Sequence, residues 1–246
     1  MTRRSSKSVK DCKNIKNKAT IAAMKIVYVN GFKIRQTLDT DFTLCHSRST
    51  DCTDYAPKFY IPENELWFDA RFKDEEKFVL EVETYEFENI EELKKKNKNS
   101  PFVDKQRWFR IERFVKKGLP PNFVEKEEQK DNLIIKYVNG SVVRQYLDPE
   151  FVFGGHDLVY SYIPKNEIWL DNKMEPKELP HILIHEAIER KLMAEGKPYD
   201  TAHEYANTYE RDSRRAAGGI YPGDPSYPSE WTKESVIQNY YVAGNE

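Results

Sequence analysis

An internal repeat is the feature that most constrains how this chain can fold. Residues 28–42 read YVNGFKIRQTLDTDF and residues 137–151 read YVNGSVVRQYLDPEF, so nine of the fifteen positions are identical. Further along each copy, YIPENELWFD at 60–69 and YIPKNEIWLD at 162–171 share seven of ten positions. Because the two blocks recur in the same order, the sequence predicts a tandem duplication of one small unit.

Each copy carries local patterns typical of an α+β fold. Short β-branched runs lead into Asn-Gly dipeptides at 30–31 and 139–140, and Asn-Gly favours a two-residue β-hairpin turn. The YIPxNExWxD block supplies a further extended segment, since Pro62 and Pro164 suit the start of a strand or an edge strand. Helical periodicity follows. We therefore expect each unit to hold a small antiparallel β-sheet followed by an αα-hairpin.

The repeat divides the chain of 246 residues into five expected segments. They are a basic leader (1–25), a degenerate first repeat without a metal site (26–116), a linker with a Pro pair and a charge run (117–132), a second repeat with a candidate metal site (133–216), and a Gly/Pro/Tyr-rich C-terminal extension (217–246). The extension is expected to wrap on the second repeat or to stay mobile.

Charge and hydropathy exclude several classes of protein. The leader carries eight Lys/Arg and one acidic residue, whereas the whole chain has a formal net charge of −2. Such a leader is typical of a disordered tail, with an organelle transit peptide or a weak nucleic-acid contact as the alternatives. It lacks the apolar core of a secretory signal, and the chain has no run of roughly 18 apolar residues that could span a membrane.

The cysteines favour a reducing compartment. Cys12, Cys45 and Cys52 are an odd number and form no CxxC pair, which argues against a secreted disulfide framework. A cytoplasmic location is therefore expected. A metal site built from Cys45, His46 and Cys52 is the weaker interpretation, because adjacent residues point in opposite directions on a strand and the spacing matches no standard zinc finger.

The densest set of chemically active side chains lies in residues 181–211, HILIHEAIERKLMAEGKPYDTAHEYANTYER. The apolar spacing predicts a helix from about 180 to 195 that ends at Gly196, a typical C-terminal stop. A second helix is expected over about 201–215, with Asp200 as its N-cap. A short loop between them makes an αα-hairpin.

The two helices are expected to bring metal ligands together. His185 and Glu189 are four residues apart and share one helix face, and His203 projects from the second helix. Two imidazoles and a carboxylate are a ligand set of catalytic zinc sites, with a fourth position left for water. Glu186 follows the first ligand, as the general base does in HExxH enzymes, and Glu210 is a candidate fourth ligand.

The same residues resemble a known family. HEAIE matches the zincin motif HExxH with Glu189 in place of the second histidine, and the later pattern GxxYxxAHxxAxxxE places His203 where a zincin has its downstream glutamate. Over about residues 137–215 the chain resembles small uncharacterised zincin-like domains of phage and mobile-element proteins. This resemblance implies a zinc-dependent peptidase acting on a peptide or protein, with IWLD (168–171) as the edge strand that receives the substrate, in the cytoplasm or in a virion.

Other interpretations of the cluster stay open at this stage. The His/Glu pairs could be ordinary helix-surface pairs, or could hold a structural metal or a polar core in a non-enzymatic virion or mobile-element protein. Glu210 decides between these, because a fourth protein ligand would close the site. Zinc is favoured by the imidazoles, although the carboxylates would also suit manganese or iron.

The first repeat and one further histidine, His156, are expected to take no part in the metal site. Counting from the shared Asp69 and Asp171 places Glu83, Thr84 and Phe87 opposite positions 185, 186 and 189. Matching Glu112 with Glu210 places Lys105 opposite His203, so no histidine is retained there. His156, in FGGHDLVY, is expected to be a surface histidine after a Gly pair.

Overall fold

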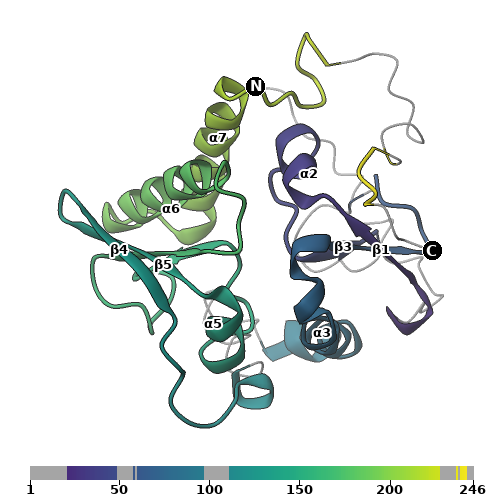
Figure 1. Ribbon diagram of the computed structural model, residues 1–246, viewed down its shortest axis with the longest axis horizontal. Coiled ribbons are helices and arrows are strands. Elements are labelled where there is room, and N and C mark those ends of the chain that lie inside the picture. Colours follow the sequence, from purple (N-terminus) through teal and green to yellow (C-terminus); the bar gives the residue numbers. More distant parts are fainter. Residues whose placement is uncertain are drawn as a thin grey trace.

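The computed structural model describes residues 21–48, 58, 60–96, 111–227, 237 and 239–242. It is a mixed α+β structure with two small mixed sheets (Figure 1). Most of the basic leader, together with Cys12 and Cys52, lies outside the described residues. The predictions for these parts are therefore not addressed by the structure.

The first sheet is built by the first repeat and has the order β1-β3-β2. Strands β1 (Lys25–Val29) and β3 (Glu65–Asp69) are parallel, and β2 (Cys45–Ser47) is antiparallel to β3. The short helix α2 (Gly31–Thr37) follows β1. The parallel pair contradicts the all-antiparallel sheet expected from the sequence, because the chain crosses over through α2 instead of turning back as a hairpin.

The second sheet repeats this arrangement and adds one strand, in the order β4-β5-β7-β6. Strands β5 (Leu133–Val138) and β7 (Glu167–Asp171) are parallel, β6 (Gly154–His156) is antiparallel to β7, and α5 (Gly140–Tyr146) follows β5. Strand β4 (Val124–Lys130) pairs with β5 at the edge. Residues 124–130 of the predicted linker are therefore a strand of this sheet.

Both Asn-Gly dipeptides begin helices, and the predicted hairpin turns are wrong. The Asn30 side chain accepts a hydrogen bond from the backbone N–H three residues later at 2.9 Å, and Asn139 caps α5 in the same way. The glycines are needed for space, since a Cβ at Gly31 would lie 1.8 Å from Oδ2 of Asp69, and Gly140 faces an equally close carboxylate. Asn is a good N-cap as well as a good turn residue, so the dipeptide alone is ambiguous.

Helices follow the sheets in both repeats. In the first, a 3₁₀ turn (Ala70–Glu75) leads into α3 (Glu76–Lys96), and the described helical residues 111–114 contact α3 through Phe114, whose ring lies 6.5 Å from that of Phe78 and 5.6 Å from that of Tyr85. In the second, α6 (Leu179–Ala194) and α7 (Tyr199–Ala216) form the predicted αα-hairpin, which Figure 1 shows on one side of the second sheet. Gly196 has φ +90°, which explains why α6 ends there. The two predicted helices are confirmed to within about two residues, the usual uncertainty of helix ends.

The two repeats share one hydrophobic core. Leu66 and Phe68 of the first sheet belong to the same buried cluster as Ile168 and Leu170 of the second. The C-terminal extension also joins the first repeat, where Tyr241 pairs with β1, whereas the sequence led us to expect it on the second. The extension packs on an aromatic residue of the first repeat, since the ring centroids of Tyr240 and Tyr241 both lie 6.1 Å from that of Trp67.

Buried ion pairs connect the repeats in both directions. Arg35 of the first repeat binds Glu178 of the second at 2.6 Å, and Arg144 of the second binds Glu75 of the first at 2.8 Å. Each arginine also pairs with the aspartate that ends the central strand of its own repeat, namely Asp69 and Asp171. Both arginine side chains are fully buried, so each depends on these partners.

Candidate metal centre

A group of buried histidines and glutamates lies where α6, α7 and β6 meet. His185 and Glu189 come from one face of α6, His203 comes from α7, and His156 comes from the end of β6. The antiparallel hairpin places the His203 turn of α7 opposite Glu189. Local helix periodicity thus explains the first two residues, and the hairpin geometry brings in the third.

The three predicted ligands converge. Oε2 of Glu189 lies 2.6 Å from Nδ1 of His203 and 3.5 Å from Nε2 of His185, and the two imidazole nitrogens are 3.2 Å apart. Separations near 3.3 Å are what a tetrahedral ion with ligand bonds of about 2.0–2.1 Å requires. The donor set suits a small divalent cation, and two of the three separations match this value; the 2.6 Å contact between His203 and Glu189 is a hydrogen bond that would lengthen on binding.

Glu210 orients His185 and does not join the ligands. Its Oε2 lies 3.0 Å from Nδ1 of His185, and its Oε1 accepts a hydrogen bond from Nε of Arg214 at 2.9 Å. Since a carboxylate only accepts, Nδ1 carries a proton, and Nε2 is the nitrogen that a cation would use once the ring is neutral. The sequence suggested Glu210 as a fourth ligand, but with both oxygens engaged it takes the outer position common behind metal-binding histidines.

Charges within the cluster are strongly coupled. Burial alone would lower the pKa of His185, but hydrogen bonds to Glu189 and Glu210 outweigh burial and hold this pKa well above its usual value. Burial would raise the pKa of Glu189, yet hydrogen bonds from His156, His185 and His203 hold it far below the usual range. Without a cation, a proton on His185 balances these carboxylates. A divalent cation would take over that role.

Glu186 is a further buried carboxylate of this cluster, on α6. Its relative exposure is 8%, and within the described part of the chain it makes no hydrogen bond or ion pair. Burial, together with repulsion from Glu189 and Glu210, raises its pKa to about 8, against the opposing effect of His185. Gly154 of β6 provides its space, since a Cβ there would lie 2.9 Å from Oε1 of Glu186.

His156 was expected at the surface, and this prediction is wrong. The structure buries it completely, and its Nε2 lies 3.1 Å from Oε1 of Glu189. Its Nδ1 accepts a hydrogen bond from the backbone N–H of Leu158 at 3.2 Å, so Nε2 carries the proton and donates to Glu189. His156, Glu186 and Glu189 are close enough to share an ion, but this tautomer makes His156 a support for Glu189. The two glycines before His156 could have indicated this burial, because glycines in a strand let it pack closely against a helix.

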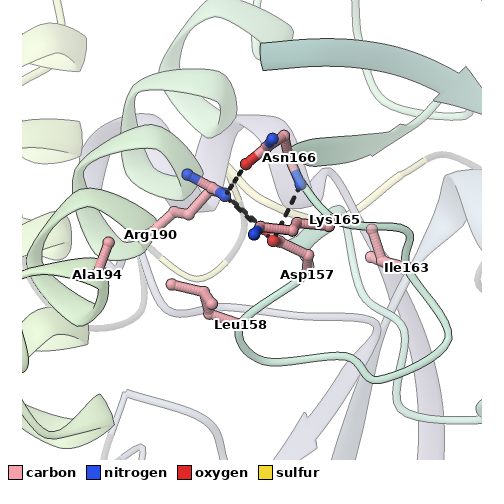
Figure 2. Close-up of a pocket in the computed structure, with 7 residues that line it drawn as sticks. All are labelled: Asp157, Leu158, Ile163, Lys165, Asn166, Arg190 and Ala194. Carbon is pink, nitrogen blue, oxygen red and sulfur yellow. Dashed lines mark hydrogen bonds and ion pairs between the residues drawn. The ribbon is translucent and has the colours of Figure 1, made fainter. Parts of the chain in front are cut away.

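A pocket of about 500 Å³ lies beside the centre (Figure 2). Seven residues line it, namely Asp157, Leu158, Ile163, Lys165, Asn166, Arg190 and Ala194. Arg190 spans its wall, bound to Asp157 at 2.5 Å and to the Asn166 side chain at 2.9 Å. Because Asp157 follows His156 and Arg190 follows Glu189, the pocket adjoins the cluster along β6 and α6.

The strand next to the centre is β6, not the one predicted. The segment IWLD belongs to β7, which is paired on both sides, by β5 and by β6, and so offers no free edge. Strand β6 is an edge of the sheet and packs against α6. Of the two edge strands, β4 and β6, it is β6 that packs beside the centre, so an extended peptide could reach the centre by adding to the sheet along β6.

The described residues of the first repeat form no equivalent group. Among the described residues, both groups of His, Cys, Asp and Glu that lie close enough to hold an ion belong to the second repeat. Glu83 and Thr84 lie on α3, whereas Lys105 and the side chain of Phe87 fall outside the described residues. Ser47 occupies the position in β2 that His156 occupies in β6, as the pairing with Leu66 and Ile168 shows.

Comparisons of the chain with protein-family models, with curated proteins and with solved structures find no match. The resemblance of residues 137–215 to zincin-like domains therefore stays a prediction. In the part of the chain that the structure describes, no helix combines the length and the apolar content needed to cross a bilayer.

Proposed function

We propose that the second repeat is a zincin-like, metal-dependent hydrolase that acts on peptide bonds, within a chain that arose by tandem duplication. The observation that carries this proposal is the convergence of Nε2 of His185, Nδ1 of His203 and Oε2 of Glu189 within bonding range of one small cation. Zinc is the cation that best suits two imidazoles and one carboxylate, with manganese or iron as the next choices.

Three protein ligands leave room for water and substrate. Because Glu210 is held by His185 and Arg214, it would not serve as the fourth ligand, and a position would stay open for water as in catalytic zinc sites. His203 also remains partly accessible, with 24% of its side chain exposed. These features support a catalytic over a purely structural ion.

Glu186 is suited to move a proton. It lies next to the ligand His185 in sequence but about 100° further round the helix, so its carboxylate can face water near the ion. Burial and the neighbouring carboxylates raise the pKa of Glu186 in the cation-free cluster, and a bound cation would lower it toward the range in which a carboxylate accepts a proton. The bound cation would supply Lewis acidity, and Glu186 would accept the proton of the attacking water.

The non-enzymatic alternative is favoured by one observation. Even without a cation, each ligand has a polar partner: His156 and His203 bind Glu189, and His185 binds Glu210. Such a satisfied network can serve as a polar core in a structural or interaction protein, such as a component of a virion or mobile element.

Activity measurements separate the two functions. Metal-loaded wild type is incubated with a peptide library and with ester substrates, beside Glu186→Gln and a His185→Ala/His203→Ala double variant. A hydrolase predicts turnover that the Gln variant loses while keeping its metal. The structural alternative predicts no turnover, and loss of stability only in the double variant.

A further inference from the structure

We propose that the first repeat sets the cation affinity of the second through a chain of buried charges, in which Arg35 and Arg214 are positioning residues for His185. This inference rests on the proposed cation site. It goes beyond that site by giving the first repeat, which shows no ligand group of its own among the described residues, a part in metal binding.

The chain begins at the ligand His185. Its Nδ1 donates to Oε2 of Glu210 at 3.0 Å, and Oε1 of Glu210 lies 2.9 Å from Nε and 2.8 Å from Nη2 of Arg214. The direction of the His185 lone pair therefore depends on where Glu210 sits. Both oxygens of Glu210 are engaged, so Arg214 fixes that position.

The chain continues across the boundary between the repeats. Arg214 lies 3.3 Å from Oε1 of Glu178, and the same oxygen accepts a hydrogen bond from Nε of Arg35 at 2.6 Å. Arg35, Glu178 and Arg214 are all fully buried. Glu178 is also bound by Arg71 at 2.8 Å, through its other oxygen. A change at Arg35 therefore alters the balance of charges around Glu178 and reaches Arg214 through the oxygen that Arg35 and Arg214 share.

A second contact couples the same elements. Nε2 of Gln36, the neighbour of Arg35 on α2, donates to the backbone carbonyl of Arg214 at 3.2 Å. The backbone N–H of Ile220 donates in turn to the carbonyl of Gln36 at 3.2 Å. The C-terminal end of α7, which carries Arg214, is thus held by the first repeat through backbone as well as charge.

The reciprocal cluster provides a matched control within the same chain. Arg144 occupies the same place in the second repeat and is equally buried. It binds Asp171 of its own repeat and Glu75 of the other repeat, each at 2.8 Å. However, its glutamate, Glu75, is shared with Lys173 and with no group of the cation centre. A change at Arg144 thus disturbs an equivalent ion pair without a path to His185.

The experiment compares Arg35→Lys with Arg144→Lys in the full chain. Zinc affinity is measured at neutral pH by competition with a chromophoric chelator, and urea unfolding of the metal-free proteins is measured in parallel. We expect Arg35→Lys to weaken zinc binding about tenfold, as losses behind a ligand do. Arg144→Lys should change affinity by less than about twofold, because distant sites act independently. Both should lose stability.

Equal zinc affinities in the two variants, or an unchanged affinity in Arg35→Lys, would overturn the inference while leaving the cation site intact. If either lysine variant does not fold, the isosteric pair Glu178→Gln and Glu75→Gln provides the same comparison, with the same expected ranking. A wild-type protein that binds no zinc contradicts the proposed function itself, which is a different result from equal affinities.

Discussion

Glu210 and His185 face each other across the αα-hairpin, with Oε2 of the carboxylate 3.0 Å from Nδ1 of the imidazole. This contact decides which nitrogen of His185 is available to a cation, although Glu210 lies 25 residues further along the chain. A ligand and the group that orients it therefore come from different helices. The packing of α6 against α7 is consequently part of the centre.

Glu210→Gln tests this orientation. The amide retains the shape of the side chain but removes the charge that holds the Nδ1 proton. Zinc affinity should fall by about 10–100-fold, the usual cost of losing a carboxylate behind a metal-bound histidine. Isothermal titration of the metal-free variant with zinc measures this change. An affinity equal to that of wild type would mean that Glu210 does not orient the ligand.

Glu186→Gln separates catalysis from binding. This variant should keep the cation, because none of the three proposed ligands is altered, and should lower turnover by roughly 10²-fold or more, the scale of general acid–base catalysis. Metal content and hydrolysis are measured on the same preparation. Full activity in the Gln variant would remove Glu186 from the mechanism, and loss of the metal would make it a ligand.

The ionisation of Glu178 makes the stability of the fold depend on pH. Burial would raise its pKa, but Arg35, Arg71 and Arg214 lower it from 4.5 to about 2. A carboxylate with a depressed pKa stabilises the fold fully above the unfolded value of 4.5, and this contribution is lost as pH falls through about 2. At about 1.36 kcal/mol per pKa unit, the contribution amounts to about 3 kcal/mol.

Urea unfolding of wild type and Glu178→Gln between pH 6 and pH 2 checks this assignment. The stability difference between the two proteins should be largest near pH 6 and should shrink as the pH falls from 4.5 toward 2. A difference that stays constant over this range would show that the charge of Glu178 contributes nothing.

Gly31→Ala tests why a glycine follows the N-cap. The new Cβ would meet Oδ2 of Asp69 at 1.8 Å, so backbone or carboxylate must move, and overpacking of this kind costs about 1–3 kcal/mol. Thermal or urea unfolding measures the loss. In an Asp69→Ala background the same substitution should cost much less, and an undiminished cost there would place the clash elsewhere.

Local sequence patterns predicted the helices and part of the candidate site, whereas strand pairing and the burial of His156 depend on non-local contacts. The two helices of the αα-hairpin follow from apolar residues three to four apart, which a single sequence displays directly. His185 and Glu189 share one face by the same spacing, and the short loop of the hairpin predicts that His203 lies near them. His156 could not be assigned in this way, because its burial depends on where β6 packs against α6. The Asn-Gly dipeptides misled for another reason: an N-cap and a hairpin turn favour the same residues, and only the parallel strand pairing distinguishes them.

The central claim is that the second repeat holds one cation at His185, Glu189 and His203. Elemental analysis of protein purified without an immobilised-metal column, after dialysis against zinc at neutral pH, tests it most directly. We predict one zinc per wild-type chain, and none in the His185→Ala/His203→Ala double variant at equal folded content by circular dichroism. A folded wild-type protein that retains no metal, or a double variant that retains as much as wild type, would contradict the claim.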